Sequence, residues 1–360
     1  MMASKPCRVQ SLLAALAVGA SLGLLAPSAV AGVANRGLPG ASRSNPLAGM
    51  RWGLYTGPNY NSMYPFYQRA RGGTRRLLAR IALRPQMFWF GSWFADSDAS
   101  SAARNFIANA TGGNQAVLSQ MVVFRLDPWE GQACPNGSWS TADQRSYRRW
   151  VDNLAGGIGR ARVALVLQPD LAFSTCAPSR VPLQLVNYAA RRFNALPHTS
   201  VYIDGGVHYW PSFDQAVGML QAAGIRDVRG FALNTSEFDT TGGEIEYGVR
   251  LAQALAAAGS GHKHFVINTA GNGAGFLNGE VADPSNPPLC GSRSEAKCIT
   301  LGIPPTTHVA SSRWHLSGYD ANLAFHYTDA YLWVDRPWLS GAGSFNRPRA
   351  LALAATTPFP

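Results

Sequence analysis

A proline and a carboxylate stand just after one apolar stretch of the chain. The run Val163–Leu167 holds only valine, alanine and leucine, and Gln168, Pro169 and Asp170 come after it. Such a run, ended by a breaker, predicts a strand buried on both faces with Asp170 at its carboxyl end. In α/β barrels that end carries the chemistry. Because apolar walls favour the protonated carboxyl, Asp170 is a candidate general acid near neutral pH.

Polar and aromatic residues also follow other predicted strands. Carboxylates, an amide and indole rings around one rim suit a sugar, because tryptophan packs on the pyranose face while Asp and Asn bond the hydroxyls. Glycosidic cleavage needs one carboxylic acid at the leaving oxygen and a second carboxylate across the bond or along a water chain. The further candidates for this rim are Trp89, Glu130, Asp204, His208, Trp210, Asn234, Trp333 and Asp335.

Each of these residues also has a plainer interpretation. A single Asp after a strand is more often a helix cap or a turn residue, and a tryptophan there is most often part of the core. Their joint placement after consecutive strands favours a functional site.

Short β-rich runs alternate with helical patterns from Arg51 onward, which predicts a parallel sheet with right-handed crossovers. The predicted strands are Trp52–Tyr55, Met87–Phe90, Met121–Leu126, Arg162–Leu167, Val201–Asp204, Arg229–Leu233, Phe265–Asn268 and Ala330–Val334. The predicted helices include Thr141–Ile158 with a threonine N-cap, Leu183–Leu196, Asp214–Ala223 and Gly243–Ala258. Since no dinucleotide fingerprint is present, we expect an α/β fold, a distorted barrel of about seven or eight parallel strands with the site at their carboxyl ends.

The first 31 residues have the pattern of a secretory signal peptide. Lys5 and Arg8 precede the short apolar run Ser11–Leu25, and Ala29–Ala31 supplies small residues for cleavage. We expect a flexible lead-in over 32–48, a single catalytic domain over 49–360, export from the cytoplasm and no stable membrane association.

The cysteines agree with export. Beyond Cys7 in the leader the chain holds four, Cys134, Cys176, Cys290 and Cys298, without the spacing of a zinc site. The pairing Cys134–Cys176 and Cys290–Cys298 is favoured, since it alone closes two separate loops.

The formal net charge of +11 does not indicate a nucleic-acid partner, because lysine is almost absent and arginine is scattered along the chain. The one dense arginine patch, between Arg71 and Arg80, is typical of a solvated helix face. His262 and His264 share one strand face but lack a third ligand, so we expect no metal and no cofactor. We expect a monomer.

Five ordered blocks carry a family resemblance. They are Tyr147–Ala172, Val201–Asp204, Val228–Asn234, His264–Thr269 and Cys298–Gly302. In this order and spacing they resemble glycoside hydrolase family six, the inverting endoglucanases and cellobiohydrolases that act on β-1,4-glucan. The resemblance extends from about Arg51 to Ala355 and implies a distorted barrel of seven or so strands.

The resemblance also implies roles for individual residues. Asp170 falls on the general acid of the family, and Glu130 lies near its second carboxylate, where the family has Asp immediately beside the cysteine. Asp204, Trp210 and Asn234 match substrate-contacting positions, and Trp89 resembles the tryptophan of a glucose subsite.

Three departures from the family pattern stand out. After the last strand the family has Lys and then Glu-Cys-Asp, whose Asp is often proposed as the base, whereas this chain has Asp335-Arg336; Asp335 could substitute or form a salt bridge. Asn268 and Gly271 replace an Asp and an Arg. The loop between Cys290 and Cys298 is shorter than usual, which favours an open groove and endo action.

These observations predict an exported enzyme, an inverting endo-β-1,4-glucanase. The alternatives are a glucan-binding protein that has lost catalysis, an exo-acting cellobiohydrolase, and an enzyme for another β-glucan such as xyloglucan.

Overall fold

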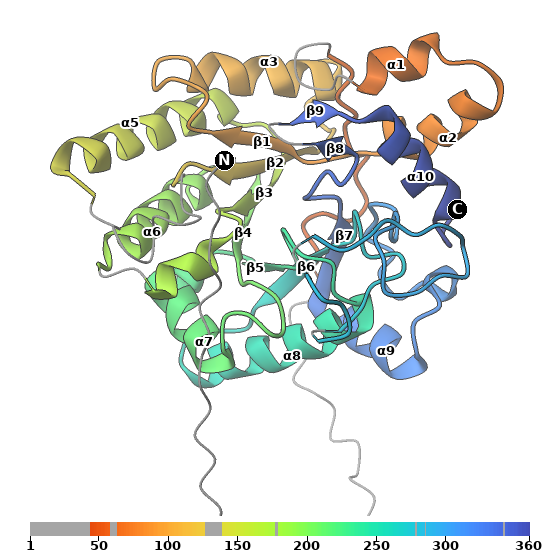
Figure 1. Ribbon diagram of the computed structural model, residues 1–360. Helices are drawn as coiled ribbons and strands as arrows, with labels where there is room; N and C mark the ends of the chain where they lie inside the picture. The colour runs from red at the N-terminus through yellow and green to blue at the C-terminus, as the bar shows by residue number, and fades with distance from the viewer. Residues whose placement is uncertain are drawn as a thin grey trace, which may run out of the picture. The chain divides into compact units, whose positions relative to one another are not determined.

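Seven apolar runs form one parallel sheet in which each strand pairs with the next along the sequence. The strands are β1 (Phe88–Gly91), β2 (Ser119–Phe124), β3 (Val163–Leu167), β4 (Thr199–Asp204), β5 (Gly230–Leu233), β6 (His264–Asn268) and β7 (Thr328–Leu332). The predicted strand Trp52–Tyr55 is wrong, because only Trp52 makes an isolated bridge, to Leu118. The sheet curls into the distorted barrel that the sequence predicts (Figure 1).

The computed structural model describes residues 44–57, 63–126, 139–176, 179–277, 279–284, 286–340 and 343–360. All of these belong to the unit Gly40–Pro360. The predicted leader and most of the predicted lead-in therefore lie outside the described residues. Within the described part of the chain, no helix has both the length and the apolar character needed to cross a membrane.

Strand β3 shows why the sheet is buried on both faces. All five of its residues are buried. Val163, Leu165 and Leu167 pack in the layer between the sheet and the helices, while the alternate residues Ala164 and Val166 belong to a separate cluster inside the barrel. Side chains of successive strand residues point to opposite faces, so an unbroken apolar run fills both layers.

Helices cover the outside of the sheet. They are α1 (Met63–Arg69), α2 (Gly72–Ala82), α3 (Ala99–Thr111), α5 (Thr141–Ile158), α6 (Val181–Asn194), α7 (Phe213–Ala222), α8 (Thr241–Ala257), α9 (Gly318–Tyr327) and α10 (Arg347–Thr356). From α3 to α9 each packs against the next around the barrel, whereas α2 packs with α1 and α10 (Figure 1). The predicted helix bounds are met within two residues, but the N-cap of α5 is Ser140, which forms a capping box with Asp143.

The first and last strands do not form a ladder with each other. Among the described residues, the backbone link across this seam is one hydrogen bond, from the amide of Met87 to the carbonyl of Trp333 at 3.0 Å. The indole of Trp89 adds a bond to the carbonyl of Val334 at 2.7 Å. The barrel is thus closed on one side by two hydrogen bonds instead of a strand pair.

The amino ends of the strands hold a buried ion network. Asp329 of β7 accepts two hydrogen bonds from Arg229, at 2.8 and 2.9 Å, and one from the hydroxyl of Tyr202 at 2.7 Å. The imidazole of His264 lies 3.2 Å from the same carboxylate. Burial acts to raise the pKa of Asp329, but the bonds from Arg229 and His264 hold it below its usual value. His264 therefore belongs to the structural end of the barrel, away from the carboxyl rim.

Candidate active site at the carboxyl rim

The backbone is strained where β3 and β5 end. Gln168, Asp170 and Asn234 have φ values of 58°, 61° and 60°, in the left-handed region. A non-glycine residue held there costs about 1–3 kcal/mol, and such residues cluster at functional sites.

A serine from the neighbouring loop holds the Asp170 carboxylate. The hydroxyl of Ser236 donates to Oδ1 of Asp170 at 2.5 Å. Ser236 comes two residues after Asn234, which follows β5. The loop after β5 therefore places the Ser236 hydroxyl beside Asp170, which follows β3. Asp170 itself is only partly buried. A partly exposed, hydrogen-bonded carboxyl at the rim is the geometry that a proton donor to a bound substrate requires.

Asp204, the last residue of β4, lies next to Asp170. It is 1% exposed and accepts hydrogen bonds from the hydroxyl of Thr235 at 2.7 Å and the amide of Leu171 at 3.2 Å. Burial raises the pKa of Asp204 to about 7, and the charge of Asp170 adds to the shift against the opposing bond from Thr235. The rim therefore has two interacting carboxyl groups with different solvent access, as the sequence predicts for consecutive strand ends.

Gln168 is a rim residue that the sequence interpretation passed over. Its side chain is fully buried, and its Oε1 accepts from the amides of Arg125 at 3.3 Å and Leu126 at 3.1 Å. These amides begin the segment after β2. Glu130 lies further along that segment and, like Cys134, outside the described residues, so its catalytic role and the Cys134–Cys176 pairing stay predictions.

Two asparagines join the ends of β5, β6 and β7. The amide of Asn234 donates to the carbonyl of Asn268 at 3.1 Å, and Asn268 donates back to the carbonyl of Asn234 at 2.8 Å. The side-chain oxygen of Asn268, Oδ1, also accepts a hydrogen bond from the backbone amide of Val334 at 3.0 Å. Asn234 is 0% exposed, so its amide serves the protein backbone in this structure and a sugar contact there stays a prediction.

Gly271 explains another departure from the family pattern. A Cβ atom at this position would lie 2.7 Å from the ring of Phe238 and 3.3 Å from Ile299. The aromatic ring fills the space where a longer side chain would emerge, so a larger residue at position 271 would require the ring of Phe238 to move.

The three predicted tryptophans have different environments. Trp89 is partly buried at the seam, with the guanidinium of Arg336 5.7 Å from its ring centroid. Trp210 is also partly buried and packs edge-on against Phe173 at 4.8 Å. Trp333, in contrast, is 1% exposed and donates its indole hydrogen to the carbonyl of Ile303, so its side chain lies in the core and away from the rim surface.

Asp335 follows β7 and is partly buried. Burial raises the pKa of Asp335, against the opposing positive charges of Arg336 and Arg349. Its amide also approaches the Asn268 oxygen, at 3.4 Å. Asp335 is thus fixed at the rim by its backbone.

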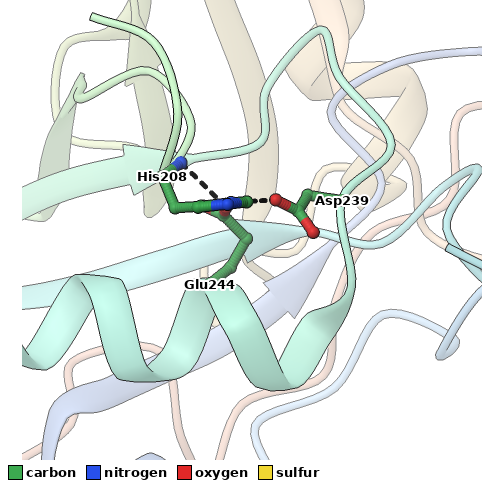
Figure 2. Close-up of side chains that lie close together, drawn as sticks. All are labelled: His208, Asp239 and Glu244. Atoms are coloured by element: carbon green, nitrogen blue, oxygen red, sulfur yellow. Dashed lines mark hydrogen bonds and ion pairs between the residues drawn. The ribbon is translucent and has the colours of Figure 1, made fainter. Parts of the chain in front are cut away.

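A second acidic group lies beside the rim, around His208. The Nδ1 atom of His208 contacts Oδ2 of Asp239 and lies 3.4 Å from Oε1 of Glu244 (Figure 2). Hydrogen bonds to Asp239 and then Glu244 raise the pKa of His208 to about 10, and burial raises the pKa of Glu244 to about 7. Asp239 and Glu244 are absent from the sequence predictions, because one reads as a loop residue and the other as part of a helix.

The long segment after β6 carries the predicted second disulfide. Cys290 and Cys298 are bonded, with a sequence separation of 8. The amide of Cys290 bonds the carbonyl of Ile299 at 3.0 Å, so the closed loop is tied to the chain that follows it.

The curled parallel sheet is an α/β barrel with acidic residues at the carboxyl ends of β3 and β4. This is the arrangement of a barrel enzyme whose site is suited to hydrolysis. The model of the glycosyl hydrolases family 6 matches residues 53–344. The chain belongs to this family.

Individual relatives agree with this assignment. Endoglucanase A of Cellulomonas fimi is 33% identical over 234 residues, which are 64% of this chain and 49% of that protein. The chain thus spans about half the length of that relative. Endoglucanase 1 of Streptomyces halstedii is 31% identical over 258 residues, 69% of this chain and 77% of that protein.

A solved structure shows the same fold. The endoglucanase Cel6 of Mycobacterium tuberculosis, in complex with methyl-cellobiosyl-4-deoxy-4-thio-β-D-cellobioside, has a TM-score of 0.67 and 26% identity to this chain. The match covers 86% of this chain and 98% of that one. Similarity to this structure supports the distorted barrel as the family fold.

Proposed function

We propose that this protein is an exported β-1,4-glucanase that cleaves internal bonds of cellulose-like chains with inversion. The observation that carries the proposal is the placement of Asp170 at the carboxyl end of β3, bonded to Ser236 and next to the buried Asp204. The endoglucanase names of the similar proteins and the short Cys290–Cys298 loop support endo action. The leader pattern and the cysteine usage support export.

In the proposed mechanism, Asp170 donates its proton to the glycosidic oxygen while a water attacks the anomeric carbon from the opposite face. Glu130 assists through a water chain or by its charge, and Asp335 is the candidate base. Inversion needs about 6.5–9.5 Å between acid and base to leave room for the water. Trp89 and Trp210 are the proposed stacking surfaces for glucose units, and the partly exposed His208 is a proposed polar contact. Asp204 is buried, so we propose that it acts through its charge on Asp170 and not by direct contact with the sugar.

Asp170→Asn tests the mechanism directly. On carboxymethylcellulose, kcat should fall by about 10²–10⁴-fold, the usual contribution of a general acid, while the melting temperature changes little. Asp214→Asn, at an exposed aspartate in the first turn of α7, is the matched control and should keep full activity. Near wild-type turnover in Asp170→Asn would refute the assignment. The anomer released from a soluble cello-oligosaccharide, followed by NMR, tests inversion.

A glucan-binding protein without catalysis is the second candidate. The changed residues at Asn268, Gly271 and Asp335 favour it, since they alter the surroundings of the acid and of the base. Binding to cellulose with no new reducing ends would support it. Release of cellobiose alone, without a fall in the viscosity of the polymer solution, would instead indicate an exo-acting enzyme.

A further inference from the structure

Three chain segments place His208, Asp239 and Glu244 together. His208 lies after β4, Asp239 lies in the loop after β5, and Glu244 lies in the first turn of α8 (Figure 2). One potential ligand atom from each side chain falls within 4.8 Å of the other two. Three donors from three elements meet at one point, which is the arrangement of a coordination site.

Two buried carboxylates share one imidazole in this cluster. Asp239 and Glu244 are both 0% exposed. Of the described residues, His208 is the one basic side chain within ion-pair distance of either carboxylate. When both carboxylates are ionised, a protonated imidazole leaves one buried negative charge, which the cluster removes either by protonating Glu244 or by binding a cation. A divalent cation with a neutral imidazole and two carboxylates gives a net charge of zero.

The hydrogen bonds of the cluster are also incomplete. Oδ1 of Asp239 accepts from the amide of Thr240 at 2.5 Å, and Oε1 of Glu244 accepts from the amide of His208 at 3.0 Å. Oδ2 of Asp239 contacts Nδ1 of His208, whereas Oε2 of Glu244 is buried and has no hydrogen-bond partner among the described residues. Glu244 thus keeps one buried oxygen without a partner, and Asp239 is in contact with the imidazole nitrogen that a metal would take.

We propose that His208, Asp239 and Glu244 bind one divalent transition-metal ion, with zinc as the best-suited metal. An imidazole nitrogen with two carboxylate oxygens suits zinc and its neighbours, whereas calcium and magnesium take oxygen ligands almost exclusively. Three protein ligands leave at least one position for water. Sequence patterns do not predict this site, because its ligands come from three separate elements.

The metal would fix the loop that serves the catalytic acid. Ser236, which bonds Asp170, lies three residues before Asp239 in the same loop. The carbonyl of Asp239 already accepts from the side chain of Asn272 at 2.7 Å, so the loop is anchored at this residue by its backbone. A metal bond to the Asp239 carboxylate adds an anchor to the side chain. The ion is therefore assigned a positioning role.

Zinc titration of the full chain, stripped with EDTA, tests the site by isothermal calorimetry. We expect one zinc per chain and, at a zinc concentration a hundred times the Kd, a melting temperature higher by roughly 5 °C. His208→Ala and Asp239→Asn should each weaken zinc binding more than about 100-fold. Residues that only contact a metal ligand already change metal affinity by about 10–100-fold, so the loss of a ligand itself should cost more. His262→Ala, at an exposed histidine elsewhere, should bind zinc as the wild type does.

Several results would overturn the site. Zinc that binds equally well to His208→Ala, or that is lost in His262→Ala, would place the ion elsewhere on the surface. Crystals of the wild-type protein soaked in zinc chloride give a readout that needs no variant. An anomalous peak among the three side chains at the zinc edge supports the site, and its absence there at saturating zinc refutes it. No sugar is present, so the outcome is independent of the glucanase activity.

Discussion

Asp204→Asn should remove a pH dependence of folding stability. Burial raises the pKa of Asp204 from an ordinary 3.8 to about 7, so between these values the folded protein binds more protons than the unfolded chain. The free energy of unfolding then falls as the pH rises through this window. Three pH units at 1.36 kcal/mol each make the contribution of Asp204 roughly 4 kcal/mol.

The asparagine fits the site. Its oxygen can accept from the amide of Leu171, and the hydroxyl of Thr235 can turn to accept from the new amide group. The variant therefore keeps the contacts with Leu171 and Thr235 and cannot ionise, although Asp204 also accepts a bond from the backbone of Gly206. It should gain roughly 4 kcal/mol of stability relative to the wild type between pH 4 and pH 8.

Urea unfolding followed by tryptophan fluorescence at pH 4, 5.5, 7 and 8 measures the difference between the two proteins. Asp214→Asn, at an exposed aspartate, is the control and should follow the wild type at every pH. If Asp204→Asn also follows the wild type at every pH, Asp204 does not titrate differently in the folded protein and the reasoning fails.

Two further substitutions and one disulfide give additional tests. Ser236→Ala removes the bond to Asp170, so kcat should fall about tenfold or more while KM changes little, and an unchanged kcat would contradict the positioning role. Gly271→Ala places a methyl group against Phe238 and should destabilise the fold by about 1–3 kcal/mol in urea unfolding, whereas a neutral result would mean that the ring moves freely. Replacing both cysteines of the Cys290–Cys298 pair with serine should cost about 2.5 kcal/mol, the loop entropy of a short closure, and a loss near zero would contradict it.

The strands of this fold could be predicted because short apolar runs in the sequence mark the segments that become buried. The run Val163–Leu167 is buried along its whole length, and its apolar residues fill both layers of the sheet. The failed strand at Trp52–Tyr55 is also rich in apolar and aromatic residues, but among the described residues its backbone makes only an isolated bridge to Leu118 and a bond to the carbonyl of Ala110. Composition predicts a strand, whereas the neighbour that completes it depends on the tertiary structure.

The rim was predicted only in part, for a related reason. Asp204 ends β4 and Asp170 follows β3 by three residues, so their positions follow from the strand prediction. Asp239 and Glu244 meet His208 only through the path of the loop after β5, which no periodic pattern encodes. The prediction that Trp333 lies at the rim is wrong for a different reason. A tryptophan after a strand can point into the core, and Trp333 does so, with its indole bonded to the carbonyl of Ile303.

The seam between β1 and β7 gives the barrel a weak side. Every other neighbouring pair of strands is held by a ladder, while this one depends on the amide of Met87 and the indole of Trp89. Local unfolding begins where the fewest hydrogen bonds must break. We therefore expect β1, which carries Trp89, to separate from β7, which precedes Asp335, before the other strand pairs separate. We expect the amide of Met87 to exchange its hydrogen with solvent before the amides inside the strand ladders do.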